Sequence, residues 1–203
     1  MIIDKMVDIT RRTLLKSGSV VVAGSALFFC LRTPASNYLK SVQKESETID
    51  RDVSFACYEG TNDETLISLS SSKFSEVKEA LAKRKFNLPE EAQLNLSKDN
   101  NASVLEYLSE RKDFTAKAAD SIMDNHSSYE QINSNIILNN IAAKISTSKI
   151  DIMIQLVEMS THKESVLITI ARRDDTPKDI LDYLAKSPNS EVANTAEKNL
   201  EKQ

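Results

Sequence analysis

The residue types that do most enzyme chemistry are few and scattered in this chain of 203 residues. The two histidines, His126 and His162, stand among polar neighbours, and no spacing joins them as metal ligands or as an acid–base pair. Serine is abundant, but no nucleophile-elbow pattern surrounds any serine. Gly60 is the only glycine after residue 35, which excludes a glycine-rich phosphate loop. The sequence therefore predicts no catalytic, metal-binding or cofactor-binding residue and no cofactor, and we interpret both histidines as exposed.

Two pairs of adjacent acidic residues, Glu90-Glu91 and Asp174-Asp175, are the other candidates for acid–base chemistry. Both lie at predicted helix starts, where negative charge complements the helix dipole. We therefore expect both pairs to cap helices. Residues 99–101, with the sequence Asp-Asn-Asn, fill a predicted turn, as these residue types commonly do.

Cysteine chemistry is also limited. Cys30 lies in an N-terminal segment with the features of an export signal, so Cys57 alone belongs to the rest of the chain. A single cysteine forms no intramolecular disulfide and holds no metal cluster. The neighbourhood of Cys57 is partly apolar, and we predict a buried small hydrophobe rather than a reactive thiol or an intermolecular bridge.

Apolar residues recur at a regular spacing after residue 60. Three copies place two core positions eight residues apart, and two looser copies place them ten apart. The first core positions follow one another at intervals of 27, 26, 34 and 28 residues, which is the range of helical repeats. We predict that these positions form the core: Leu69 and Val77, Leu96 and Val104, Ile122 and Ile132, Leu156 and Val166, and Leu184 and Val192.

Each copy predicts a short helix that ends near the first core position, a polar turn, and a second helix that carries the second core position. Pro89 and Pro177 are expected in the first turn of a helix, where the missing N–H costs nothing. Residues 133–140 flank a short apolar run with asparagines; they either line a polar groove or form a longer connecting helix, and we favour the helix. The predicted fold is all-α: an α-solenoid of about five helix-pair repeats after an N-terminal signal or anchor helix.

The repeat resembles a known family. Residues 176–192, TPKDILDYLAKSPNSEV, resemble the leucine-rich repeat variant family and, more loosely, HEAT-type repeats, and the resemblance runs over roughly residues 61–199. It implies a curved helical solenoid with a binding role. In the founding type of that family an iron–sulfur cysteine cluster precedes the repeats; Cys57 stands alone in that region, so no cluster is implied here. The alternative is a non-repetitive helical bundle with accidental spacing.

An export signal is the second pattern. Arg11, Arg12 and Lys16 supply positive charge ahead of an apolar run over residues 14–31. Residues 10–16, TRRTLLK, resemble the bacterial twin-arginine signal Ser/Thr-Arg-Arg-x-Phe-Leu-Lys; Leu15 matches, and Leu14 stands where phenylalanine is commonest. This resemblance implies export through the twin-arginine translocase; an ordinary Sec signal or a plain basic flank is the alternative.

The fate of the signal is open among three outcomes. Cleavage after Ala35 is our first expectation, because Thr33-Pro34-Ala35 approximates the small-residue rule. Cys30 could instead be lipidated, or residues 14–31 could remain as a membrane anchor, since about 17 to 25 apolar residues span a bilayer. In each outcome the rest of the chain is periplasmic or exported and meets the membrane only through the N-terminal segment; in the third outcome residues 14–31 anchor it to the inner membrane.

Charge and composition narrow the partners. Without residues 1–35, the chain holds 21 lysines and arginines against 28 aspartates and glutamates, a net charge of −7. Nucleic acids and anionic lipid headgroups bind clustered basic residues, and no such cluster is present, so we exclude both as partners of this part. One remaining glycine, no tryptophan and an abundance of Ala, Leu, Lys and Glu favour helices.

We therefore divide the chain into a signal or anchor (1–35), a linker and N-terminal cap (36–60) and a helical repeat domain (61–203). The leading hypothesis is a non-enzymatic exported adaptor or scaffold that binds a protein partner through its repeat surface. The alternative is an accessory or electron-transfer subunit of an exported redox enzyme, which the export route and the iron–sulfur precedent suggest. A third hypothesis, a lyase-like enzyme on a HEAT-type scaffold, has no candidate residue.

Overall fold

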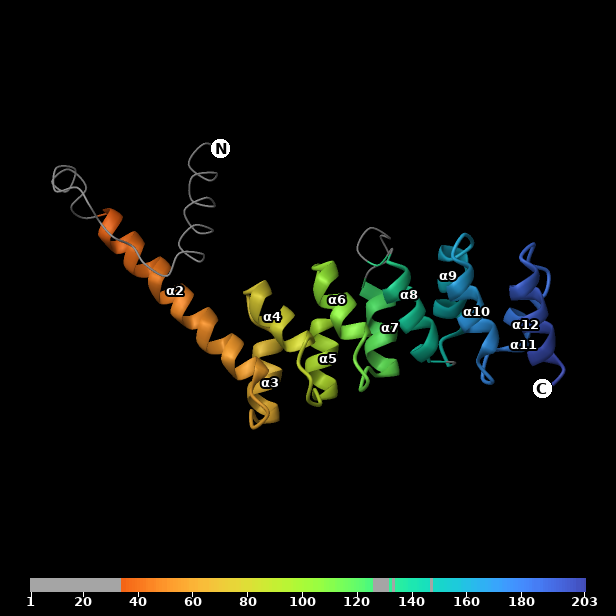
Figure 1. The fold of residues 1–203 in the computed structure, drawn as a ribbon, viewed down its shortest axis with the longest axis horizontal. Coiled ribbons are helices and arrows are strands. Elements are labelled where there is room, and N and C mark those ends of the chain that lie inside the picture. The colour runs from red at the N-terminus through yellow and green to blue at the C-terminus, as the bar shows by residue number, and fades with distance from the viewer. Residues whose placement is uncertain (1–33, 126–131, 133, 147) are drawn as a thin grey trace. The chain divides into compact units, whose positions relative to one another are not determined.

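The computed structural model describes residues 34–125, 132, 134–146 and 148–203 (Figure 1). The export-signal residues, Cys30 and His126 lie outside the described residues. Within the described ranges all regular structure is helical, which confirms the all-α prediction. The chain divides into two compact units, residues 1–45 and 46–203, which are described separately.

Of the first unit, the structure describes residues 34–45, all of which belong to α2 (Pro34–Cys57). Most of the segment assigned to a linker and cap is therefore helical. None of the described helices has the length and apolar character needed to cross a membrane. The possible anchor at residues 14–31 lies outside the described part of the chain.

The second unit continues with helices that alternate between two positions. We name α3, α5, α7, α9 and α11 the first helices, and α4, α6, α8, α10 and α12 the second helices. Their bounds are α3 (Asp63–Ser70), α4 (Ser75–Ala82), α5 (Glu90–Leu96), α6 (Ala102–Ser109), α7 (Ala116–Asn125), α8 (Asn135–Lys144), α9 (Ile150–Met159), α10 (Glu164–Arg172), α11 (Lys178–Leu184) and α12 (Ser190–Leu200).

Packing in this unit joins most helices to the helix two places along the chain (Figure 1). The second helices contact one another in succession from α4 to α12, and the first helices do so from α3 to α9. Contacts within a pair join α3 to α4, α5 to α6, α7 to α8 and α11 to α12. A helix of seven to eleven residues is too short to be stable alone, so these contacts supply its stability.

Asparagine and serine side chains start several of these helices. Asn62 Oδ1 accepts a hydrogen bond from the amide of Thr65 (2.9 Å) ahead of α3, and Asn101 and Ser134 cap α6 and α8 in the same manner. Asn189 caps α12 with two amide hydrogen bonds. These caps satisfy amides that have no partner inside the helix. Residues 99–101 form the predicted turn, where Asp99 also accepts from the amide of Asn101 (2.7 Å).

Nine of the ten predicted core positions lie on the helices and are buried, with the side chains of the two members of a pair in the same apolar cluster. Burial of a leucine or valine side chain contributes about 1.5–3 kcal/mol, so each of these positions stabilises the unit. The nine positions are Leu69, Val77, Leu96, Val104, Ile122, Leu156, Val166, Leu184 and Val192.

The tenth position, Ile132, was wrongly placed. It is buried, but it precedes α8 instead of lying on a second helix. Ile137 stands three residues after the cap Ser134, as Val104 stands three after Asn101, and it is fully buried. Residues 135–140 lie in α8, which confirms the favoured helix for that part of the stretch 133–140. The longer connection ahead of α8 moves the second core position of this pair from Ile132 to Ile137.

Three smaller expectations also need correction. Cys57 is exposed, because the buried position at the end of α2 belongs to its neighbour Ala56. Asp174-Asp175 lie in the turn between α10 and α11 and do not start a helix. Pro89 and Pro177 stand immediately before the first helical residue, so the helices begin one residue later than expected.

Candidate binding surface

The structure brings no set of chemically reactive side chains together in the ranges it describes. No three His, Cys, Asp or Glu residues there are grouped so as to hold a metal ion. His162 is exposed, as expected, and Glu90 and Glu91 occupy the first turn of α5, which confirms their predicted position at a helix start, although α5 has no side-chain cap hydrogen bond. The structure instead groups polar side chains at the junctions between helix pairs.

Two arginines with buried side chains reach back to backbone carbonyls, Arg84 from the first helix pair to the end of α2 and Arg111 from the second pair to the first. Arg84, after α4, donates from Nη1 to the carbonyl of Ala56 (3.0 Å) and from Nη2 to that of Glu59 (3.0 Å). Arg111, after α6, donates from Nη1 to the carbonyl of Arg84 (2.6 Å) and from Nη2 to that of Phe86 (2.7 Å). Each guanidinium thus satisfies carbonyls of the preceding connection, which has few other donors.

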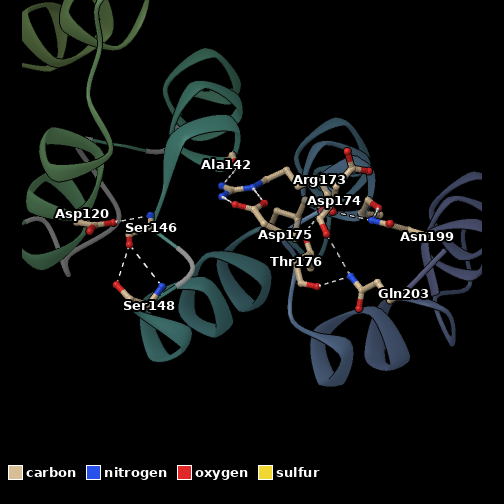
Figure 2. A network of polar contacts seen from close by, with 12 residues as sticks. Asp120, Ala142, Ser146, Ser148, Arg173, Asp174, Asp175, Thr176, Asn199 and Gln203 are labelled. Atoms are coloured by element: carbon tan, nitrogen blue, oxygen red, sulfur yellow. Dashed lines mark hydrogen bonds and ion pairs between the residues drawn. The ribbon is translucent and has the colours of Figure 1, made fainter.

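The same link recurs at the C-terminal end of the chain (Figure 2). Arg173 donates to the carbonyl of Ala142 (2.8 Å), and Asn199 donates to the carbonyls of Ala171 (2.9 Å) and Arg173 (2.6 Å). Gln203 adds a hydrogen bond to the carbonyl of Thr176 (3.0 Å). We name Arg84, Arg111, Arg173 and Asn199 the bridging residues.

The bridging residues were missed in the sequence, although a signal for them exists. Each stands seven residues after the core valine of its second helix: Arg84 after Val77, Arg111 after Val104, Arg173 after Val166, and Asn199 after Val192.

The third pair departs from this pattern. Its equivalent position is Lys144, which is exposed. The second and third pairs are joined instead by Gln93, a buried residue whose Nε2 donates to the carbonyls of Leu88 (3.0 Å) and Asp113 (2.9 Å). Its Oε1 accepts from the amide of Thr115 (3.1 Å). A neutral amide therefore replaces the guanidinium at this junction.

Carboxylates hold two of the bridging arginines in place. Arg111 Nε lies 2.9 Å from Asp113 Oδ1, and Arg173 Nε lies 2.9 Å from Asp175 Oδ1. Partial burial raises the pKa of Asp113, but hydrogen bonds from Arg111 and from the Leu88 amide outweigh it and lower that pKa overall. The hydrogen bond from Arg173 lowers the pKa of Asp175 and outweighs its partial burial. Both carboxylates are therefore charged at neutral pH.

The outward sides of the two sets of helices differ in charge. Over the described residues, the first helices expose nine carboxylates and two lysines, whereas the second helices expose four carboxylates and three basic residues. The nine carboxylates are Asp63, Glu64, Glu90, Glu91, Asp124, Asp151, Glu158, Asp179 and Asp182. The first-helix surface is therefore the acidic side of this unit.

Two asparagines of α8 bind polar residues of the neighbouring second helices. Asn139 of α8 donates to Ser165 Oγ of α10 (3.0 Å) and accepts from Thr169 Oγ1 (3.2 Å). Asn140 donates to Ser109 Oγ of α6 (3.2 Å). These hydrogen bonds link three successive second helices, so Asn139 and Asn140 have a structural role.

A shallow hollow of about 430 Å³ lies beside Arg84. Its lining combines the acidic residues Glu59 and Asp63 with the basic residues Arg84 and Lys85. Because Arg84 is engaged by carbonyls and the charges are mixed, the lining selects no particular ligand charge.

No family model, curated protein or solved structure matches this chain.

Proposed function

We propose that this protein is an exported, non-enzymatic adaptor that binds a protein partner through the outward surface of a helical solenoid of about five pairs. The observation that supports it most directly is the regular succession of helix pairs joined by the bridging residues, with an acidic, exposed surface on the first helices. Repeats of this type enlarge a surface without a proportionate increase in core, which suits binding.

The bridging residues matter to this role because they fix one pair against the next. A surface that is already ordered before binding loses less conformational entropy when a partner docks. The guanidinium of Arg111, for example, ties the end of its own pair to three carbonyls of the preceding pair. We therefore infer that the first-helix surface is presented as a preformed unit.

The export half of the proposal depends on Arg11 and Arg12, because the twin-arginine route requires both. Replacing both by lysine keeps the charge and should leave the protein in the cytoplasm. Cell fractionation measures this directly, with the unchanged chain as the control. Export that continues unchanged would contradict the twin-arginine assignment.

The adaptor half is tested by native purification of the full chain, tagged at its C-terminus, from the cell envelope. We expect a stoichiometric, colourless protein partner. A carrier protein fused to residues 1–35 is the matched control, since it retains contacts that come from the signal alone. A coloured eluate would indicate a redox assembly instead, and a clean monomer would contradict the proposal.

A further inference from the structure

The outward side of α9 combines apolar and acidic residues in one stripe. Ile150, Ile154 and Glu158 follow one another at intervals of four residues, which places them along one side of the helix. The two isoleucines are 48% and 43% exposed, although isoleucine is among the residues most often buried. Asp151 and Glu158 are also exposed. We name these four residues, Ile150, Asp151, Ile154 and Glu158, the α9 stripe.

The core does not explain the α9 stripe. The opposite side of α9 supplies the buried residues Ile152, Met153, Leu156 and Val157, so the helix already has an inward apolar side. Among the described first helices, only α9 exposes two large aliphatic side chains; Tyr183 of α11 is the other large exposed apolar residue on these helices. Two neighbouring exposed isoleucines form a small apolar patch, and exposed apolar patches rimmed by polar residues mark binding surfaces.

The helix itself explains only one of the two charges of the α9 stripe, because Asp151 lies in the first turn of α9, where negative charge complements the helix dipole. Glu158 lies in the last turn of α9, where negative charge opposes the helix dipole, and that turn has no basic residue. The nearest lysine before the helix, Lys149, pairs with Asp124 (2.7 Å), which raises the pKa of Lys149. Within the described residues, no basic side chain of α9 offsets its two carboxylates.

We propose that the α9 stripe is the docking site for a basic amphipathic segment of the partner protein, a conclusion that rests on the proposed adaptor function. Apolar residues of that segment would cover the two isoleucines, and lysines or arginines would approach Asp151 and Glu158. Charge complementarity selects this occupant. A second copy of this chain would bring the same carboxylates together, and anionic lipid headgroups would be repelled.

The probe for this site is a synthetic amphipathic helical peptide of leucine and lysine, about 18 residues long, titrated into the purified full chain and followed by fluorescence anisotropy. A peptide with glutamate in place of lysine is the ligand control. We expect binding of the lysine peptide that weakens as salt is raised, because surface charge pairs are screened by salt, and no binding of the glutamate peptide.

Two variants remove the two properties of the stripe separately. Ile150→Ser with Ile154→Ser removes the apolar contact, and Asp151→Asn with Glu158→Gln removes the charge. Each double substitution should weaken binding of the lysine peptide by about tenfold or more, the effect expected when an exposed anchor residue is lost. All four side chains are exposed, and far-UV circular dichroism verifies that each variant keeps its helices.

Matched controls carry the same changes elsewhere on the first helices. Glu91→Gln with Asp182→Asn removes two exposed carboxylates from α5 and α11, and Tyr183→Ser removes an exposed apolar side chain from α11. Both control variants should bind the peptide within about twofold of the unchanged chain. Equal weakening by control and stripe variants would overturn the α9 site and leave only a diffuse acidic surface.

The native purification distinguishes a failure of the α9 docking site from a failure of the proposed adaptor function. If the unchanged chain retains a stoichiometric partner and both stripe variants lose it, the α9 site stands. If the stripe variants retain the partner as well as the unchanged chain does, the α9 site is refuted while the adaptor function survives. If the unchanged chain retains no partner, the adaptor function fails, and the α9 site fails with it.

Discussion

Replacing Arg111 by methionine is expected to lower the free energy of unfolding by about 3 kcal/mol. The guanidinium donates to the carbonyls of Ala82 (3.2 Å), Arg84 (2.6 Å) and Phe86 (2.7 Å) and pairs with Asp113. Removing one partner of a buried ion pair costs about 3–5 kcal/mol, because it leaves the other charge and its acceptors without compensation. Asp113 keeps 25% of its side chain exposed, so water replaces part of the lost interaction and places the effect at the low end.

Urea unfolding followed by far-UV circular dichroism measures this loss, because the chain contains no tryptophan for a fluorescence assay. Lys112→Met is the matched control: the neighbouring lysine is exposed, and its replacement should change the stability by no more than about 0.5 kcal/mol. Arg111→Lys keeps the charge but loses the planar guanidinium, so its loss of unfolding free energy should lie between those of Arg111→Met and Lys112→Met. If Arg111→Met and Lys112→Met unfold at the same urea concentration, the guanidinium does not join the helix pairs.

Three further predictions concern single residues. Leu96→Ala, at a fully buried position, should lower the unfolding free energy by about 2–5 kcal/mol in the same urea assay. The Asp113 pKa is lowered in the folded state from an ordinary value of 3.8, so its contribution is present above that value and is lost as the pH falls through the folded pKa. Asp113→Asn should therefore be less stable than the unchanged chain at pH 7, and the difference should shrink in urea titrations carried out in increasingly strong acid. Native Cys57, being exposed, should react with a thiol reagent as fast as in urea, and Cys57→Ser should leave stability unchanged; slow reaction would show that the thiol is shielded.

The sequence predicts the core well because burial imposes a regular spacing on apolar residues. Leu96 and Val104 stand eight residues apart, at the same places in their pair as Leu69 and Val77, and all four side chains are buried. Spacing alone does not locate a core position where the connection between two helices is longer than in the other pairs. Ile132 was selected by distance along the chain, whereas the cap Ser134 marks where α8 begins.

Side-chain direction near a helix end is a second limit of sequence reasoning. Successive residues of a helix point about 100° apart, so an error of one position exchanges an inward side chain for an outward one. Ala56 and Cys57 illustrate this, because the alanine is fully buried and the cysteine beside it is exposed. Apolar periodicity also could not identify the α9 stripe, since α9 is apolar on its inward side as well as along Ile150 and Ile154.

The bridging residues could not be identified from apolar spacing, for a different physical reason. Their partners are backbone carbonyls, which every residue possesses, so no partner residue type marks the contact in the sequence. Only the regular interval after the core valine, as between Val104 and Arg111, reveals them. Arg111 and Arg173 are each also followed, two residues later, by the aspartate that pairs with them, but the interval after the core valine is the signal that all four bridging residues share.

The junction between the second and third pairs offers a test of how these links cooperate. Gln93 and Arg111 both contact Asp113, the glutamine through the backbone carbonyl and the arginine through the carboxylate. Gln93→Leu leaves neutral groups without partners and should cost about 1–3 kcal/mol, less than Arg111→Met. Because both links hold the same connecting residue, the double variant should lose less than the two single losses combined, by about 0.5 kcal/mol or more. Urea titrations of the four proteins measure this coupling. Strictly additive losses would mean that the two side chains stabilise separate junctions and that Asp113 does not connect them.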